Sequence, residues 1–132
     1  MTMLDSIYAH EIGIRKANPQ LDTDITCDVA IIGGGLTGVS TALTLAERGY
    51  DVALFEAHDL GAGGSGRNGG HVCQGWPNDF HHISRQISSS DADLAWHSGM
   101  GAVDLLKQNV ARYKIDCDLR FGYLHAALHK GQ

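Results

Sequence analysis

Several features are scarce or absent in this sequence, and each absence excludes a class of protein. No apolar run approaches the roughly 18 residues that a membrane-spanning helix requires, so we expect no membrane segment. The N-terminal segment contains acidic residues and lacks the apolar core of a secretory signal, so we expect a cytoplasmic protein. The 10 lysines and arginines form no cluster and are outnumbered by 15 acidic residues, giving a net charge of −5. This balance argues against nucleic acid and anionic membrane surfaces as partners.

Cysteine and metal-binding patterns are also scarce. The three cysteines are Cys27, Cys73 and Cys117. Their number is odd and no C-x-x-C pair occurs, which favours reduced thiols in an intracellular protein over disulfides or a zinc site. The adjacent His81 and His82 would point about 100° apart on a helix. His125 and His129 share a helix face without an evident third ligand. We therefore expect no metal site.

Length and composition favour a single globular domain. The chain has 132 residues, of which 43% are hydrophobic and 19% are charged, values that are ordinary for a soluble protein. Glycine is abundant, with 17 residues, and most of these lie between Gly33 and Gly70. We expect residues 1–24 to form a polar N-terminal arm over the domain surface, with a turn or two of helix within Ser6–Lys16. Residues 25–132 would form the domain itself.

Residues 28–56 carry a strand–turn–helix–strand pattern. Asp28–Ile32 is short, apolar and β-branched, as is typical of a buried parallel strand. After a glycine-rich turn, Leu36–Arg48 has apolar residues at helical spacing, and Gly49 is a residue type common just past a helix. Asp51–Phe55 is a second apolar strand that ends at the acid Glu56. This order is that of a dinucleotide-binding βαβ unit, and because both strands look buried on both faces, further strands should flank them.

The three glycines of the turn stand at G-x-G-x-x-G spacing, and each has a physical role. Gly33 allows the tight turn out of the strand, Gly35 lets backbone N–H groups approach a pyrophosphate, and Gly38 lets the helix pack closely on the strand. The helix N-terminus offers unpaired N–H donors and about half a positive charge to the phosphates. Glu56 can accept hydrogen bonds from a ribose 2′-hydroxyl and would repel a 2′-phosphate, which disfavours NADP.

A second glycine-rich stretch, Ala57–Gly70, follows the acid directly. Ser65, Arg67 and Asn68 lie among its glycines and supply hydrogen-bond donors, while the glycines let the backbone run flat against a ligand. Arg67 is placed to neutralise phosphate charge or to hold the loop. Because ligands of this fold bind at the carboxyl ends of the strands, the position of the loop favours binding over disorder.

The segments beyond the second loop read as alternately extended and helical. His71–Trp76 is expected to be a short extended segment. Asn78 can cap a helix over Asp79–Ile87. Near the end of the chain, Phe121–Leu128 reads as a strand.

The longest expected helix covers Asp91–Tyr113, with Ser90 as its N-cap. One face carries an apolar stripe that we assign to the core: Trp96, Met100, Val103, Leu106, Val110 and Tyr113. Gly99 and Gly101 weaken the middle of this helix by about 1 kcal/mol each, and we expect them to allow close packing against another element.

Three stretches resemble one family of flavoproteins: CDVAIIGGGLTG at residues 27–38, ALFEA at 53–57 and GAGGSGRNGG at 61–70. Together they are similar to the D-amino-acid oxidase-type FAD-dependent oxidoreductases, the relatives of glycine oxidase and sarcosine oxidase. Within that family the chain most resembles the gamma-glutamylputrescine oxidase-like enzymes, a likeness that extends to KQNVARYKIDCDLRFGYLHAAL at residues 107–128. GGG-x-TG combined with SGRNGG is more specific than either motif alone.

The resemblance implies an α/β fold, a Rossmann-like FAD-binding domain with a parallel sheet, of which this chain would be the incomplete N-terminal portion. It implies FAD as the cofactor, whether covalently bound or not, and a small-molecule amine or amino acid as the substrate. Such enzymes pass a hydride from the carbon of the C–N bond to the flavin, the resulting imine hydrolyses, and oxygen is usually reduced to hydrogen peroxide. The residues expected to contact FAD are Gly33, Gly35, Leu36, Thr37, Gly38, Glu56, Ala57, Ser65, Gly66, Arg67, Asn68, Gly69 and Gly70.

Two departures from the family pattern bear on function. Gly64 stands where alanine is common, which should only loosen the loop. The chain also lacks the substrate-binding domain and C-terminal FAD segment of longer members, so we assign no catalytic acid or base here. Two alternatives stay open. An NAD-linked dehydrogenase domain fits the first motif but has no need of the SGRNGG loop, and an inactive fragment fits the exposed sheet edges that an unfinished core would leave.

Overall fold

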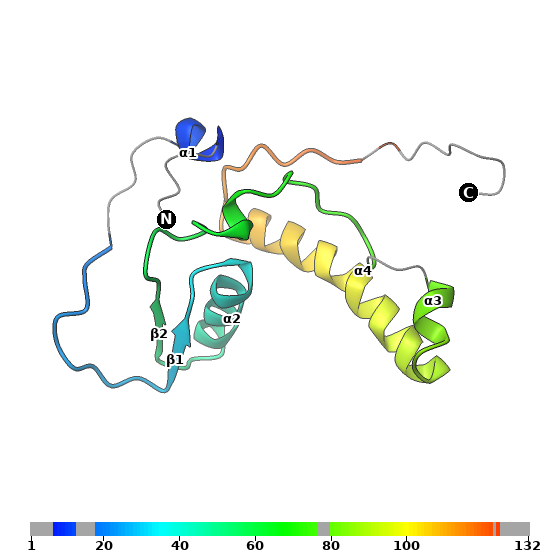
Figure 1. Cartoon of the computed structure of the whole chain (residues 1–132), viewed down its shortest axis with the longest axis horizontal. Helices are drawn as coiled ribbons and strands as arrows, with labels where there is room; N and C mark the ends of the chain where they lie inside the picture. The colour runs from blue at the N-terminus through cyan, green and yellow to red at the C-terminus, as the bar shows by residue number, and fades with distance from the viewer. Residues whose placement is uncertain (1–6, 13–17, 77–79, 123, 125–132) are drawn as a thin grey trace. The chain divides into compact units, whose positions relative to one another are not determined.

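The computed structural model describes residues 7–12, 18–76, 80–122 and 124, which fall into two units, unit 1 (residues 1–71) and unit 2 (residues 72–132). In chain order the elements are α1 (Ile7–Ile12), β1 (Val29–Ile32), α2 (Leu36–Glu47), β2 (Val52–Phe55), the 3₁₀-helix η2 (Gly64–Gly66), α3 (Phe80–Ser84) and α4 (Ser89–Arg112) (Figure 1). No helix within these described ranges has the length and apolar character needed to cross a membrane. The division into an arm over 1–24 and a domain over 25–132 stays a prediction.

Unit 1 is built around a β1–α2–β2 unit. The two strands pair in parallel, with Val29 opposite Val52 and Ile32 opposite Phe55. Helix α2 connects them and contacts both strands (Figure 1). A hydrogen bond from the Gly33 N–H to the Phe55 carbonyl, 2.7 Å long, continues the ladder past the carboxyl end of β1. This arrangement confirms the predicted α/β, Rossmann-like fold.

Helix α2 ends almost where the sequence predicts. Arg48 is its C-cap, and Gly49 follows with a φ of +87°, a left-handed conformation that favours glycine. The Gly49 N–H donates to the Ala46 carbonyl at 3.0 Å, and the Tyr50 N–H donates to the Leu45 carbonyl at 3.2 Å. These two bonds form a Schellman motif, which satisfies carbonyls that the end of a helix leaves without partners.

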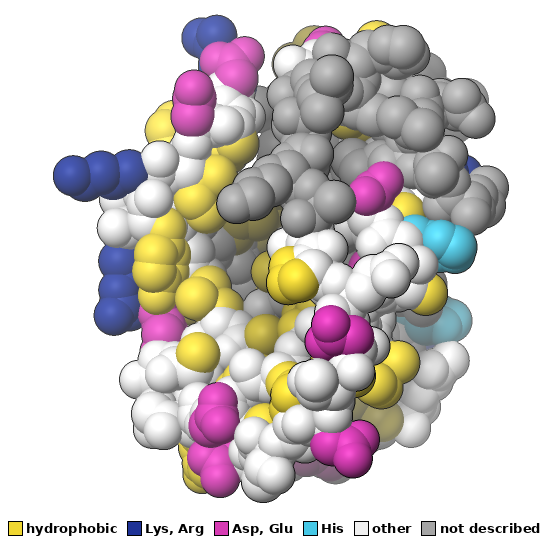
Figure 2. All heavy atoms as spheres, turned by 90° about the vertical axis from the view of Figure 1, so that its left-hand side faces the viewer, with side chains coloured by type: hydrophobic (Ala, Val, Ile, Leu, Met, Phe, Trp, Pro, Cys, Tyr) yellow, Lys and Arg dark blue, Asp and Glu magenta, His cyan; other side chains and the backbone are white. Residues whose placement is uncertain are grey.

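The expected burial of both strands is wrong for the described chain. β1 alternates half-buried and exposed residues, and Ile32 at its carboxyl end is 83% exposed. All four residues of β2 are half-buried. Within the described ranges the sheet consists of these two strands, and α2 packs against it, which leaves other side chains in solvent. Figure 2 shows hydrophobic side chains (yellow) reaching the molecular surface.

Unit 2 is built on the 24-residue helix α4, which begins earlier than predicted. Ser88, and not Ser90, is the N-cap, and its Oγ accepts a hydrogen bond from the Asp91 N–H at 3.2 Å. The same hydroxyl donates to Asp91 Oδ2 at 2.7 Å. Three consecutive serines offer the same hydroxyl, so the cap is the one that reaches the third N–H of the helix.

The predicted apolar stripe of α4 is its inward face. Val103 is 7% exposed, and most other members of the stripe are half-buried. Trp96 makes an edge-to-face contact with Phe80 of α3, with ring centroids 5.8 Å apart. Tyr113, at the end of the stripe, is 42% exposed. Helix α3 is shorter than the predicted Asp79–Ile87, and the proposed cap at Asn78 lies outside the described residues.

The two glycines of α4 have different surroundings. A Cβ atom on Gly99 would lie 3.0 Å from Nε1 of Trp76 and 3.3 Å from the backbone of Gly75. The indole is held there because Trp76 Nε1 donates to the Ala95 carbonyl at 2.6 Å. A Cβ atom on Gly101 would meet no heavy atom within 4 Å. Close packing is therefore confirmed for Gly99 and wrong for Gly101.

Two expected extended segments are not strands where the structure describes them. Residues 71–76 form no strand and contain Gly75 with a φ of +89°. Phe121, Gly122 and Leu124 also lie outside any strand. The rest of the predicted strand Phe121–Leu128 falls outside the described residues.

Candidate functional site

The first glycine-rich turn connects β1 to α2 at the carboxyl end of the sheet. Gly33 has a φ of +103°, where a residue with a Cβ atom would be strained. A Cβ atom on Gly38 would overlap the carbonyl oxygen of Gly33, so glycine is needed for the helix to approach the strand this closely. These are the backbone requirements that the G-x-G-x-x-G spacing predicts.

Glu56 follows β2, and its carboxylate accepts hydrogen bonds from the backbone of the first glycine-rich turn and from the backbone just after β2. Its Oε2 accepts a hydrogen bond from the Gly34 N–H at 2.6 Å, and its Oε1 accepts one from the His58 N–H at 2.9 Å. The Gly34 N–H first, and then the His58 N–H, lower the pKa of Glu56 below its ordinary value of 4.5, so it is charged at neutral pH. Each carboxylate oxygen keeps a second lone pair, with which it can accept a bond from a ligand hydroxyl.

Gly34 is a site residue that the sequence reasoning missed. A Cβ atom there would overlap Leu60 and lie 3.2 Å from Oε2 of Glu56. Its carbonyl also accepts a 2.9 Å hydrogen bond from the Gly61 N–H. The signal was that glycine also fills the middle position of the run 33–35, where a side chain would separate Glu56 from the turn.

Ser65 fastens the second glycine-rich loop to the start of α2. The Leu36 N–H donates to Ser65 Oγ at 3.0 Å, although the two residues are 29 positions apart. A Cβ atom on Gly35 would lie 2.9 Å from the same hydroxyl oxygen, so glycine keeps room for this contact. The two glycine-rich loops therefore meet at the N-terminus of α2.

Asn68 holds the remainder of the second loop. Its Nδ2 donates to the Ser65 carbonyl at 2.8 Å, and its Oδ1 accepts from the Gly70 N–H at 2.8 Å. Its main-chain carbonyl accepts a 2.8 Å bond from the Tyr8 hydroxyl of α1, 60 positions away in the chain. No sequence pattern pointed to Tyr8.

The other expected contact residues lie in the same two loops. Thr37 is exposed in the first turn of α2, and Ala57 is exposed directly after Glu56. Gly66 is half-buried at the end of η2, and Arg67 and Gly69 are exposed just beyond it. The structure thus gathers the predicted set at the turn, at the end of β2 and in the docked loop, while their contacts with FAD stay predictions.

These residues fit the pyrophosphate and ribose portions of FAD. Gly35, the N-cap of α2, is extended and has no side chain to cap the helix, so the Thr37 and Gly38 N–H groups remain available to an anion while the Leu36 N–H binds Ser65. The helix dipole favours negative charge at this end. The Glu56 carboxylate follows β2, the strand that pairs with β1, and a ribose hydroxyl can donate to it there.

Metal ligation finds no support in the described ranges. They contain no group of three or more histidine, cysteine, aspartate or glutamate side chains that could hold a metal ion. Cys27, Cys73 and Cys117 are free thiols. His125 and His129 lie outside the described residues.

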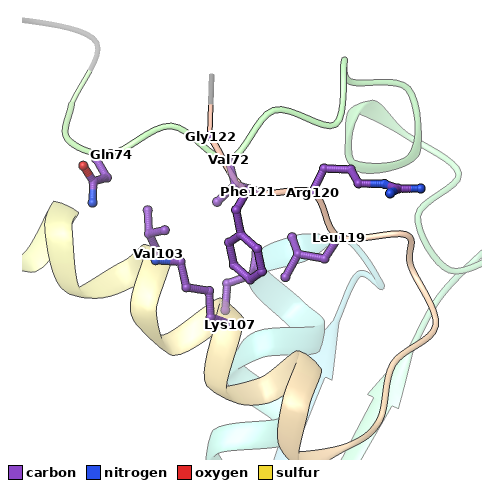
Figure 3. A pocket seen from close by; sticks show the side chains of 9 residues that line it. Val72, Gln74, Val103, Lys107, Leu119, Arg120, Phe121 and Gly122 are labelled. Atoms are coloured by element: carbon purple, nitrogen blue, oxygen red, sulfur yellow. The ribbon is translucent and has the colours of Figure 1, made fainter. Parts of the chain in front are cut away.

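Unit 2 contains a cavity of about 300 Å³ between α4 and residues 119–122. Figure 3 shows the Leu119 and Phe121 side chains pointing toward α4, whereas the Arg120 guanidinium extends away from it. Lys107, on the α4 side, is paired with Asp104 at 3.2 Å, and Arg120 with Asp118 at 2.6 Å. With both cations neutralised and mostly apolar walls, the cavity offers no evident catalytic group.

Comparison with known proteins places these motifs in a family. Residues 28–132 match the family described as DAO, FAD dependent oxidoreductase. The chain is 39% identical to the gamma-glutamylputrescine oxidoreductase of Escherichia coli K12 over 127 residues, which cover 96% of this chain and 30% of that protein. It is 34% identical to the "Probable oxidoreductase OrdL" of Haemophilus influenzae over 103 residues, 78% of this chain and 24% of that protein. No solved structure matches the chain significantly.

These matches cover most of this chain but only a small part of each relative. The chain spans less than a third of the length of both curated relatives, 30% of one and 24% of the other. The matched segment includes the β1–α2–β2 unit and both glycine-rich loops. The chain belongs to the DAO family of FAD-dependent oxidoreductases.

Proposed function

We propose that this chain supplies the FAD-binding part of an oxidoreductase that oxidises the C–N bond of a small-molecule amine or amino acid. The observation that carries the proposal is the junction of the two glycine-rich loops at the start of α2, where Ser65 Oγ accepts from the Leu36 N–H at 3.0 Å. Family membership supports FAD as the cofactor, and the similarity to gamma-glutamylputrescine oxidoreductase supports an amine as the substrate class.

The residues of this chain would bind and orient the cofactor. The N-terminus of α2 would hold the pyrophosphate, and Glu56 would accept from the adenosine ribose. When bound, FAD would accept a hydride from the carbon of the C–N bond and return both electrons, with protons, to oxygen as hydrogen peroxide. The imine product would add water and separate into a carbonyl compound and an amine or ammonia. We assign no proton-transfer residue to the described chain.

A nicotinamide-linked dehydrogenase was the main alternative. The family match favours flavin, and so does the second glycine-rich loop, which a nicotinamide site does not need. Enhanced fluorescence of NADH on addition of the chain, in the absence of flavin binding, would return this alternative to first place.

A chimeric enzyme tests the proposed function. This chain replaces the matching segment of the Escherichia coli gamma-glutamylputrescine oxidoreductase, and peroxide release is followed with gamma-glutamylputrescine as substrate. We expect the chimera to purify with flavin and to release peroxide. A folded chimera that retains no flavin contradicts the proposal, whereas one that retains flavin but releases no peroxide contradicts the amine-oxidising role alone.

A further inference from the structure

We propose that α1 is a strap whose Tyr8 is a positioning residue for the cofactor. In this inference, which rests on the proposed function, the Tyr8 hydroxyl fastens the second glycine-rich loop in its FAD-binding shape before FAD arrives. Tyr8 acts through Asn68 and does not itself contact the cofactor. The feature that points to this role is the 2.8 Å hydrogen bond from Tyr8 to the Asn68 carbonyl.

This bond completes a chain of hydrogen bonds that runs from α2 through the loop to α1. The Leu36 N–H binds Ser65 Oγ, and the Ser65 carbonyl accepts from Asn68 Nδ2. Asn68 Oδ1 then accepts from the Gly70 N–H, while the Asn68 carbonyl accepts from Tyr8. Asn68 is therefore held at its side-chain nitrogen, its side-chain oxygen and its main-chain oxygen.

The loop needs such fastening because burial does not hold it. Residues 67–70 are all exposed, and two of them are glycines, which lose the most conformational freedom when they are ordered. Gly70 has a φ of +70°, and a Cβ atom on it would lie 3.8 Å from the Tyr8 hydroxyl, so the phenol stands over the end of the loop. Ordering the loop in advance lowers the entropy cost of binding a ligand there.

The first test needs no cofactor. Amide hydrogen exchange is measured in the unaltered chain and in Tyr8→Phe, which removes only the hydroxyl. We expect exchange at Gly70 to rise roughly three- to tenfold, the factor that one neutral hydrogen bond is worth. Exchange at Gly33, whose N–H binds Phe55 in the sheet ladder, should not change. The matched control is Tyr50→Phe. Tyr50 precedes the N-terminal end of β2, whereas the second glycine-rich loop follows its carboxyl end, and Tyr50 is 50% exposed.

The second test measures FAD affinity by quenching of flavin fluorescence. Tyr8→Phe should weaken binding roughly three- to tenfold, while Tyr50→Phe leaves it unchanged. Tyr8→4-aminophenylalanine, which restores a donor at the same place, should recover most of the affinity. A merely structural role would not predict that recovery.

The outcomes separate this inference from the proposed function. Unchanged exchange at Gly70 in Tyr8→Phe overturns the strap. Faster exchange with unaltered FAD affinity overturns the positioning role. If neither the unaltered chain nor the chimera binds FAD, the proposed function fails, and the exchange measurement alone then decides whether α1 fastens the loop.

Discussion

Unit 1 and unit 2 each rely on a different kind of internal contact. In unit 1, backbone groups define the site: Gly33 turns at a φ of +103°, and the Gly34 and Leu36 N–H groups bind Glu56 and Ser65. In unit 2, Trp96 of α4 makes an edge-to-face contact with Phe80, and the Trp76 indole lies against α4 at Gly99. Glycine shows the difference most clearly. A Cβ atom on Gly38 in unit 1 would overlap the backbone carbonyl of Gly33, whereas a Cβ atom on Gly101 in unit 2 would meet no heavy atom within 4 Å.

The contrast has a physical reason. A phosphate-binding turn must bring main-chain N–H groups close to a ligand, which leaves no space for side chains. A helix packed through an apolar stripe has side chains as its contact surface and tolerates change wherever that surface is open. Substitutions at matched glycines can therefore test the contrast.

The largest effect is expected for Gly38→Ala. The added Cβ atom would overlap the Gly33 carbonyl oxygen, and backbone cannot move aside as the end of a side chain can. We expect a cost of about 3 kcal/mol, equivalent to a roughly hundredfold loss of FAD affinity if the turn is displaced. The measurement is a flavin fluorescence titration with thermal unfolding alongside it. Affinity within a factor of two of the unaltered chain would mean that α2 does not sit this close to β1.

A smaller effect should separate the two glycines of α4. Gly101→Ala fills open space and should stabilise the helix by about 1 kcal/mol, since alanine is the better helix former. Gly99→Ala gains the same propensity but displaces the Trp76 indole from its bond to Ala95. We expect Gly101→Ala to be the more stable variant by about 1–2 kcal/mol in thermal unfolding followed by circular dichroism. Equal stabilities would show that Trp76 does not pack on α4.

The N-cap of α4 gives a third comparison. Ser88→Ala removes the acceptor for the Asp91 N–H and should cost about 1 kcal/mol. Ser90→Ala, within the first turn, should change the free energy of unfolding by less than about half of that. The reverse order would place the start of the helix at the residue that the sequence alone favoured.

The smallest effect is a pH dependence at Glu56. The pKa of Glu56 is lowered in the folded chain, chiefly by the Gly34 N–H. Its carboxylate therefore contributes to folding stability at pH values above the ordinary pKa of 4.5. That contribution is lost as the pH falls below 4.5 through the folded pKa. We expect the Gly34 amide resonance to titrate with a midpoint below 4.5, and Glu56→Gln to abolish the titration. A midpoint above 4.5 would mean that the carboxylate does not bind the turn.

Much of unit 1 could be predicted because its determinants are local. The positions of Gly33, Gly38 and Gly49 reflect backbone conformations and close approaches within one turn of chain, and the structure shows each of them. The strands' burial could not be predicted in the same way. An apolar sequence such as that of β1 is compatible with a strand covered on both faces and with one that is exposed on one face. In β1 the second case holds, and Ile32 is 83% exposed.

Contacts between distant residues were the other limit. Ser65 was expected to bind the cofactor, and its attachment to Leu36 follows from a fold that spacing alone does not define. The hydrogen bond of Tyr8 could not be predicted for the same reason, because Tyr8 and Asn68 are 60 positions apart in the sequence. The cap of α4 was misplaced by a different ambiguity, since Ser88, Ser89 and Ser90 are chemically identical.

The most direct test of the central claim is a visible absorption spectrum of the 132-residue chain after FAD is added and the excess removed. If the two glycine-rich loops form a flavin site, the chain will retain flavin absorption, and Gly38→Ala will retain much less. A chain that shows helical circular dichroism but keeps no flavin would contradict the claim that residues 33–70 form the site.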